Sequence, residues 1–150
     1  MTTPFAKKRP AKILCAVACV CALLTPAAAQ KLTRSGETVV PVYEGYQPNS
    51  DGSFDLLFGY FNRNWAEQID VPVGKDNHLE PGGPDHGQPA HFYPRRNRFV
   101  FRVRVPPDFG TSEVVWTLRT KGETLTAYGT LRPEYELDDI AIMANFGGAG

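Results

Sequence analysis

Beyond residue 37, the chain alternates short apolar runs with clusters of glycine, proline, asparagine and aspartate. The runs are rich in β-branched and aromatic residues, which favour strands, and no stretch sustains a helical period. The pattern predicts an all-β fold, and about seven short strands are typical of an immunoglobulin-like β-sandwich. The predicted strands cover residues 38–43, 53–62, 67–71, 77–79, 98–105, 113–120 and 124–131.

Residues 98–105 show the clearest alternation of apolar and basic positions. The odd-numbered positions are phenylalanine or valine, whereas the even-numbered ones include Arg98, Arg102 and Arg104. Because successive side chains of a strand point to opposite faces, one face is predicted to join the core and the other to contact solvent. Both faces of residues 53–62 are largely apolar, which predicts a central strand.

The last three predicted strands follow one another closely, and we expect them to form a meander. Lys121, Gly122 and Glu123 separate the final two strands and predict a hairpin turn. Positions 114, 116 and 118 of one strand, and 125, 127, 129 and 131 of the other, are predicted to point inward. Pro106 and Pro107 should end the strand before them, because proline has no amide hydrogen to donate.

The connection from Gly74 to Arg98 is long and contains four prolines and all three histidines of the chain. Its composition predicts tight turns and extended segments on the surface. We expect Phe92 and Tyr93 to anchor this connection to the core.

Residues 1–29 have the pattern of a cleaved signal peptide. Four basic residues precede a 12-residue apolar run, and Ala27, Ala28 and Ala29 supply the small residues before a cleavage site. The run is shorter than the roughly 20 residues that span a bilayer, so we expect a secreted or periplasmic protein with no membrane span after cleavage. A lipoprotein signal ending at Cys19 stays open as an alternative.

Cleavage after Ala29 changes the composition of the chain. All three cysteines leave with the leader, which excludes thiol chemistry and cysteine-ligated zinc in the rest. Four of the 16 lysine and arginine residues also leave, so 12 basic residues remain against 16 acidic ones, a net charge of −4. That charge disfavours general binding to nucleic acid. The remaining length is sufficient to bury a single core without disulfides.

We expect residues 30–135 to form the β-sandwich domain and residues 136–150 to form a C-terminal tail. The tail passes from acidic residues through an apolar segment to small residues at positions 147–150. Small, flexible residues of this kind are typical of a linker. The pattern therefore predicts that the chain is a truncated form of a longer protein with a further domain.

Two segments resemble motifs of uncharacterised exported bacterial proteins. They are residues 49–64, NSDGSFDLLFGYFNRN, and residues 80–94, EPGGPDHGQPAHFYP. Those proteins look like immunoglobulin-like or fibronectin type III-like sandwiches, so the resemblance, which covers residues 39–146, implies that fold. It implies no activity. His86 stands where such proteins often have arginine.

Four arginines make a first candidate binding surface. They are Arg96, Arg98, Arg102 and Arg104, whose even spacing places them on one strand face. Such a ladder could bind an anionic glycan or an acidic partner. The alternative is that acidic residues on neighbouring strands pair with the arginines, as is common on exposed sheet faces.

Aromatic residues make a second candidate surface, because flat rings can stack on sugars. The candidates are Tyr46, Phe61, Trp65, Phe92 and Tyr93. Stacking would require several of these rings to be exposed on one face. The alternative is that they fill the core.

The histidines His78, His86 and His91, with Asp76 and Asp85, could supply ligands to zinc or copper, although their spacing matches no compact motif. The alternative is that they are exposed hydrogen-bonding side chains. The chain has no Gly-x-Ser-x-Gly elbow and no compact serine, histidine and aspartate grouping. We therefore predict no catalytic residue and no cofactor.

Together these patterns predict an exported noncatalytic binding or assembly module of the bacterial envelope. Its partner would be an envelope protein or a glycan, bound by Trp65 and the four arginines. A metal-dependent enzyme that uses the histidine loop, and a carbohydrate-binding module, stay open as alternatives.

Overall fold

The computed structural model describes residues 34–146, so the predicted leader over residues 1–29 lies outside the described part of the chain. Its strands form three antiparallel sheets, with the orders β1-β2-β6, β3-β5 and β4-β7-β8. The predicted all-β fold class is confirmed. The strands are β1 (Val39–Pro48), β2 (Phe54–Asn62), β3 (Ile69–Asp70), β4 (Asn77–Glu80), β5 (His91–Phe92), β6 (Arg95–Val105), β7 (Val114–Thr120) and β8 (Glu123–Gly129). They are followed by the 3₁₀ helix η1 (Pro133–Tyr135) and the helix α1 (Asp139–Phe146).

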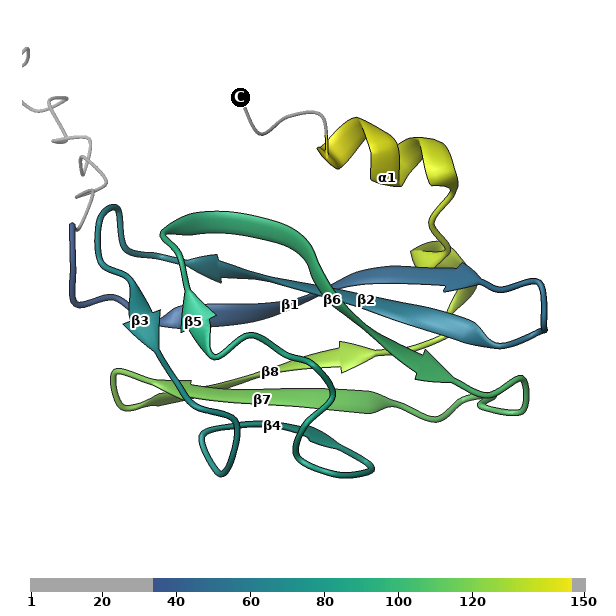
Figure 1. The fold of residues 1–150 in the computed structure, drawn as a ribbon, viewed down its shortest axis with the longest axis horizontal. Helices are drawn as coiled ribbons and strands as arrows, with labels where there is room; N and C mark the ends of the chain where they lie inside the picture. The colour runs from purple at the N-terminus through teal and green to yellow at the C-terminus, as the bar shows by residue number, and fades with distance from the viewer. Residues whose placement is uncertain (1–33, 147–150) are drawn as a thin grey trace, which may run out of the picture. The chain divides into compact units, whose positions relative to one another are not determined.

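The two three-stranded sheets lie in two layers and share one hydrophobic core (Figure 1). Phe58 of β2 and Phe101 of β6 enter this core from one layer, and Trp116 of β7 enters it from the other. The Trp116 ring makes edge contacts with both phenylalanines, at centroid distances of 6.2 Å and 5.0 Å. Burial of such large rings provides most of the apolar area that a small domain needs.

The alternation of apolar and polar residues predicted the strands of this core well. β2 lies in the centre of its sheet, as its two apolar faces indicated. Phe101, Val103 and Val105 of β6 are buried, whereas the residues between them are exposed. Trp116 of β7 and Ala127 of β8 likewise point inward, as predicted.

The predicted meander of the last three strands is wrong. β6 pairs with β2 in one layer, whereas β7 pairs with β4 and β8 in the other. Eight residues separate β6 from β7 and turn twice, with the amides of Phe109 and Ser112 donating to the oxygens of Pro106 and Phe109. A connection of this length can cross the roughly 10 Å between packed sheets, whereas a tight hairpin uses two to five residues.

The predicted hairpin between β7 and β8 is confirmed. Thr120 pairs with Glu123, so Lys121 and Gly122 form a two-residue turn. Both have a positive φ, of 52° and 82°, which is the backbone of a type I′ turn. This turn follows the right-handed twist of its two strands and so specifies their register.

β1 continues five residues beyond its predicted end because it contains a bulge between Tyr43 and Gly45. Gly45 has a φ of 135°, and a side chain there would meet the backbone oxygen of Tyr135. Beyond η1 the chain returns to this strand, where the Leu137 amide donates a 2.9 Å hydrogen bond to the oxygen of Tyr46. The domain therefore continues past the boundary that we predicted at residue 135, and α1 lies in the segment predicted as a linker.

The long connection from Gly74 to Arg98 contains β4, β5 and the start of β6. Phe92 anchors it as predicted, since its ring is fully buried against Tyr60 at 4.9 Å. Tyr93 does not, because its side chain is 57% exposed. Further attachment comes from the buried amide side chains of Asn77 and Gln88.

Asn77 is the centre of this amide network. Its side-chain nitrogen donates to the backbone oxygens of Val71 and Pro89 at 2.9 Å and 2.8 Å, and its side-chain oxygen accepts a 2.9 Å bond from the indole of Trp116. Gln88 in turn donates to the backbone oxygen of Asn77 at 3.3 Å. The side-chain oxygen and nitrogen of Asn77 are thus both paired, as burial of a polar group requires.

Within residues 34–146, none of the helices has the length and apolarity that crossing a membrane requires.

Candidate functional site

The structure places the predicted binding residues Arg96, Arg102 and Arg104 beside carboxylates on the β1-β2-β6 sheet. Asp55 of β2 has a side chain that is only 4% exposed, and it accepts a 2.9 Å bond from Arg104 and a 3.4 Å bond from Arg102. The hydrogen bond from Arg104 lowers the pKa of Asp55, and the same pair raises the pKa of Arg104. Arg98 is exposed on the same strand.

The third arginine, Arg96, pairs with Glu44 of β1. Both carboxylate oxygens of Glu44 lie within 2.7 Å of one guanidinium nitrogen of Arg96. A side chain at Gly59 would clash with the Glu44 carboxylate and with the backbone oxygen of Asn97. The glycine in the central strand therefore provides the space in which this ion pair lies.

The three histidines occupy separate surroundings. His78 lies on β4 opposite Thr117, and His86 lies in a turn against Gly82. His91 of β5 bonds to Asp70 through Nδ1 at 2.6 Å. Among the described residues, no three histidine, cysteine, aspartate or glutamate side chains are grouped so that they could hold a metal ion.

The five aromatic candidates divide between the core and the surface. Tyr46 and Phe92 are core residues, which agrees with the alternative interpretation of the aromatics and removes these two from the stacking candidates. Phe61 is half-buried, whereas Trp65 is 52% exposed and Tyr93 is more exposed still. The exposed pair belongs to two sets of contacting side chains, in which Arg95 contacts Phe61 and Trp65 and His91 contacts Tyr93, and we call both sets together the aromatic cluster. Its members are Phe61, Trp65, His91, Tyr93 and Arg95.

Arg95 joins two rings of the aromatic cluster. Its guanidinium carbon lies 4.5 Å from the ring centroid of Trp65 and 5.1 Å from that of Phe61. A guanidinium at this distance is attracted by the electron-rich ring faces. The backbone of Arg95 has a φ of 69°, a left-handed conformation that is uncommon outside glycine. Such strain persists only where surrounding contacts hold it, and it is frequent at functional sites.

His91 joins the other half of the aromatic cluster. Its ring meets that of Tyr93 edge-on, at a centroid distance of 4.7 Å and an angle of 77°. Its two nitrogens bond to the side chains of Asp70 and Gln68. The loop after β2 therefore contacts the β5–β6 segment twice, once from Trp65 to Arg95 and once from Gln68 to His91.

Two fully buried asparagines hold the backbone of the segments that carry the aromatic cluster. Asn62 donates to the backbone oxygens of Glu67 and Phe92, at 2.8 Å and 3.1 Å, and so ties the Trp65 loop to β5. Asn64 donates to the side-chain oxygen of Asn62 at 2.8 Å and to the backbone oxygen of Glu37 at 2.7 Å. The backbone that carries Trp65 and Tyr93 is thus held by buried hydrogen bonds.

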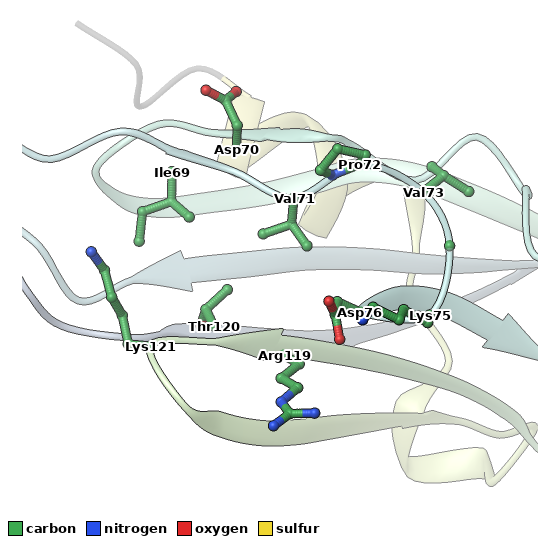
Figure 2. Close-up of a pocket in the computed structure, with 11 residues that line it drawn as sticks. Ile69, Asp70, Val71, Pro72, Val73, Lys75, Asp76, Arg119, Thr120 and Lys121 are labelled. Carbon is green, nitrogen blue, oxygen red and sulfur yellow. The ribbon is translucent and has the colours of Figure 1, made fainter.

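A pocket of about 530 Å³ lies next to this cluster (Figure 2). Ile69 and Val71 point into it from one side, and Thr120 and Lys121 line it from the opposite side. Asp70 points away from its interior and reaches His91 instead. A smaller pocket of about 310 Å³ lies between residues 110–113 and 130–133.

Sequence reasoning found Trp65 and Tyr93 but missed Arg95, Gln68 and Asp70. Arg95 enters the cluster because β6 pairs with β2 in a register that sets it opposite Asn62. That register depends on long-range pairing, and the only local signal was the position of Arg95 directly after Pro94. The pocket was missed as well, because its lining comes from two segments that are distant in the chain.

Comparison of the chain with protein-family models, with curated proteins and with solved structures finds no match.

Proposed function

We propose that the chain is an exported noncatalytic binding module of the bacterial envelope, with an immunoglobulin-like β-sandwich as its scaffold and the aromatic cluster as its binding surface. One observation carries this proposal. Trp65 and Tyr93 keep more than half of their surface in water although buried hydrogen bonds hold the backbone beneath them. Exposed aromatic side chains on a rigid frame are the groups that contribute most to binding free energy.

The strand order supports the immunoglobulin-like scaffold. In the usual lettering of that fold, strands A, B and E form one sheet and strands C, F and G form the other. Here β1, β2 and β6 form one sheet, and β4, β7 and β8 form the other, in the same chain order. The chain departs from antibody domains in placing its buried tryptophan, Trp116, on β7 instead of on the third strand.

The leader pattern supports export. A basic segment, a short apolar run and three alanines precede a chain that contains no cysteine. Partners outside the cytoplasm include envelope proteins and glycans, and both are recognised through aromatic side chains.

The aromatic cluster is a better binding surface than the arginine ladder. Arg96, Arg102 and Arg104 already have carboxylate partners within the sheet. Binding an anion there would compete with these internal ion pairs. Binding at Trp65 and Tyr93 would instead remove exposed apolar surface from water, which is favourable.

Fluorescence quenching tests this proposal, because the chain contains two tryptophans and Trp116 is fully buried. Iodide should quench the emission of Trp65 alone. We expect at least one fraction of a bacterial envelope extract to protect Trp65 from iodide, and the Tyr93→Ala variant to lose that protection.

Trp65→Phe is the control, because it should abolish the quenchable emission with or without extract. Protection by no fraction, or protection that is unchanged in Tyr93→Ala, would contradict the proposed binding surface.

A further inference from the structure

We infer that the aromatic cluster binds an uncharged glycan chain, with sugar rings stacking on Trp65 and Tyr93. The inference rests on the proposed function and names its ligand class. It combines four features of the cluster: an open ring face, neighbouring hydrogen-bonding groups, internally paired charges and a rigid backbone.

The open ring face is that of Trp65. Arg95 covers one face of the indole, at 4.5 Å from its centroid. Trp65 is nevertheless 52% exposed, and we infer that a ligand contacts the face of the indole opposite Arg95. The face of an aromatic ring carries partial negative charge, and the C–H groups on one side of a sugar ring carry partial positive charge, so the two surfaces attract each other. Arg95 fixes the tilt of the indole, which makes it a positioning residue.

The hydrogen-bonding groups surround His91. The amide oxygen of Gln68 accepts a 2.8 Å bond from Nε2 of His91, and the side chain of Asp70 is 77% exposed although it bonds to His91. Amide and carboxylate groups are planar and have two polar atoms each, so each can bond to two neighbouring hydroxyls of a sugar. Such groups beside an aromatic ring give a site that contacts both the apolar and the hydroxyl surfaces of a sugar.

The charges around the cluster favour an uncharged ligand. Glu67 lies 2.5 Å from Lys121, Arg63 lies 3.5 Å from Glu37, and the Asp70 carboxylate is hydrogen-bonded to His91. Arg95 supplies the permanent positive charge of the cluster, and two ring faces already stabilise it. An acidic polysaccharide needs a row of available cations, and this surface instead presents rings, an amide and paired charges.

The rigid backbone favours binding without an ordering cost. The buried side chain of Asn62 connects the Trp65 loop to β5 through two hydrogen bonds, and the amide of Tyr93 donates a 2.9 Å bond to the hydroxyl of buried Tyr60. Both exposed rings are therefore attached to held backbone before a ligand arrives. Preorganisation of this kind raises affinity by reducing the entropy lost on binding.

Affinity electrophoresis in native gels tests the inference on the full mature chain. The gels contain hydroxyethylcellulose, a mixed-linkage β-glucan, a galactomannan or an arabinoxylan, and a heparin gel serves as the anionic comparison. We expect at least one of the four uncharged polysaccharides to retard the wild type. We expect Trp65→Ala to raise the dissociation constant about tenfold or more, and Tyr93→Ala to raise it by a smaller factor.

Tyr128→Ala is the matched control, because Tyr128 of β8 is also 52% exposed but lies outside the aromatic cluster. It should be retarded as the wild type is. Arg95→Gln should raise the dissociation constant severalfold and also increase quenching of Trp65 by acrylamide, an uncharged quencher, since the covered ring face opens. Unchanged acrylamide quenching in a folded Arg95→Gln variant would contradict the role of Arg95 as a positioning residue.

Three results would overturn the glycan inference. They are no retardation by any of the four uncharged polysaccharides, equal retardation of wild type and Trp65→Ala, or retardation by heparin alone. If a protease-sensitive envelope fraction nevertheless protects Trp65 from iodide, the ligand is a protein, and the proposed binding function stands without the glycan. If no fraction protects Trp65 either, both proposals fail.

Discussion

Arg104 donates a 2.9 Å hydrogen bond from its Nε to the Oδ1 of Asp55, across the register pair that joins β6 to β2. The two partners differ in their surroundings, since the Asp55 side chain is almost fully covered whereas that of Arg104 is largely exposed. Water can therefore solvate the arginine in both the folded and the unfolded protein. In the folded protein, the hydrogen bonds of the Asp55 carboxylate must come from other protein groups. The pair stabilises the fold mainly by satisfying a buried carboxylate.

The free energy of unfolding should depend on Asp55 at acid pH. The hydrogen bond from Arg104 lowers the pKa of Asp55 in the folded state, so the carboxylate adds stability above its unfolded pKa of about 3.9. That stability is lost as the pH falls through the lower, folded pKa. We expect Asp55→Asn to lower the free energy of unfolding by about 1 to 3 kcal/mol at pH 7. In urea unfolding, the difference in free energy of unfolding between the wild type and Asp55→Asn should decrease between pH 7 and pH 3. The control Asp108→Asn, at an exposed position, should have the same free energy of unfolding as the wild type. A difference that stays constant over this range would contradict the assignment.

Tyr43 should produce the opposite dependence at alkaline pH. Its hydroxyl donates to the backbone oxygen of Thr130, and burial raises its pKa well above the ordinary value. A raised pKa means that the neutral form adds stability below the unfolded pKa of about 10, and that this stability is lost as the pH rises through the folded pKa. Tyr43→Phe should therefore lose about 1 kcal/mol at pH 7, and this deficit should narrow by pH 11. Urea unfolding at both pH values measures the deficit, with Tyr128→Phe as the exposed control; a deficit that widens would refute the prediction.

Asn77 should be among the most sensitive polar positions of the chain. Asn77→Ala removes the partner of the Trp116 indole and of two backbone oxygens, all within a fully buried region. Unpaired buried groups and a new cavity should together lower the free energy of unfolding by about 3 kcal/mol or more. Asn97→Ala, at a partly exposed position, should lower it by less than about 1 kcal/mol. Equal effects of the two substitutions in urea unfolding would show that the network contributes little.

Gly59 should tolerate no side chain. A methyl group there would clash with the Glu44 carboxylate and with the backbone of Asn97, so one of them must move. We expect Gly59→Ala to lower the free energy of unfolding by about 2 kcal/mol, as overpacking does elsewhere. Gly83→Ala is the control, because nothing lies within 4 Å of its added methyl group. A melting temperature for Gly59→Ala that equals that of Gly83→Ala would show that the sheet adjusts freely.

The alternation of residues along the chain was sufficient to predict the long strands, because side-chain direction in a strand is a local property. It did not predict β5, a strand of two residues that exists only through its pairing with Ile69 and Asp70 of β3. Nor did it predict which sheet β6 joins, since partner choice depends on how an eight-residue connection crosses between layers.

For the candidate site, too, local sequence patterns predicted some features, whereas features that depend on long-range contacts were not predicted. Residue type alone pointed to Trp65 as a binding residue. Exposure is a property of the folded chain, so residue type alone did not separate exposed Trp65 from Phe92, which was a stacking candidate as well as an expected anchor and is a core residue. Arg95 was missed because its contact with Trp65 depends on strand register and on a left-handed backbone.

The side chains of Asn62 and Asn64 hold their neighbours through backbone atoms, at Glu37, Glu67 and Phe92. Backbone oxygens are identical in every amino acid, so the identities of the outward-facing residues can change without removing these supports. The ligand specificity of the aromatic cluster can therefore change by substitution of its outward-facing residues while the fold is kept. For the same reason this surface is a suitable place to engineer binding of a new ligand.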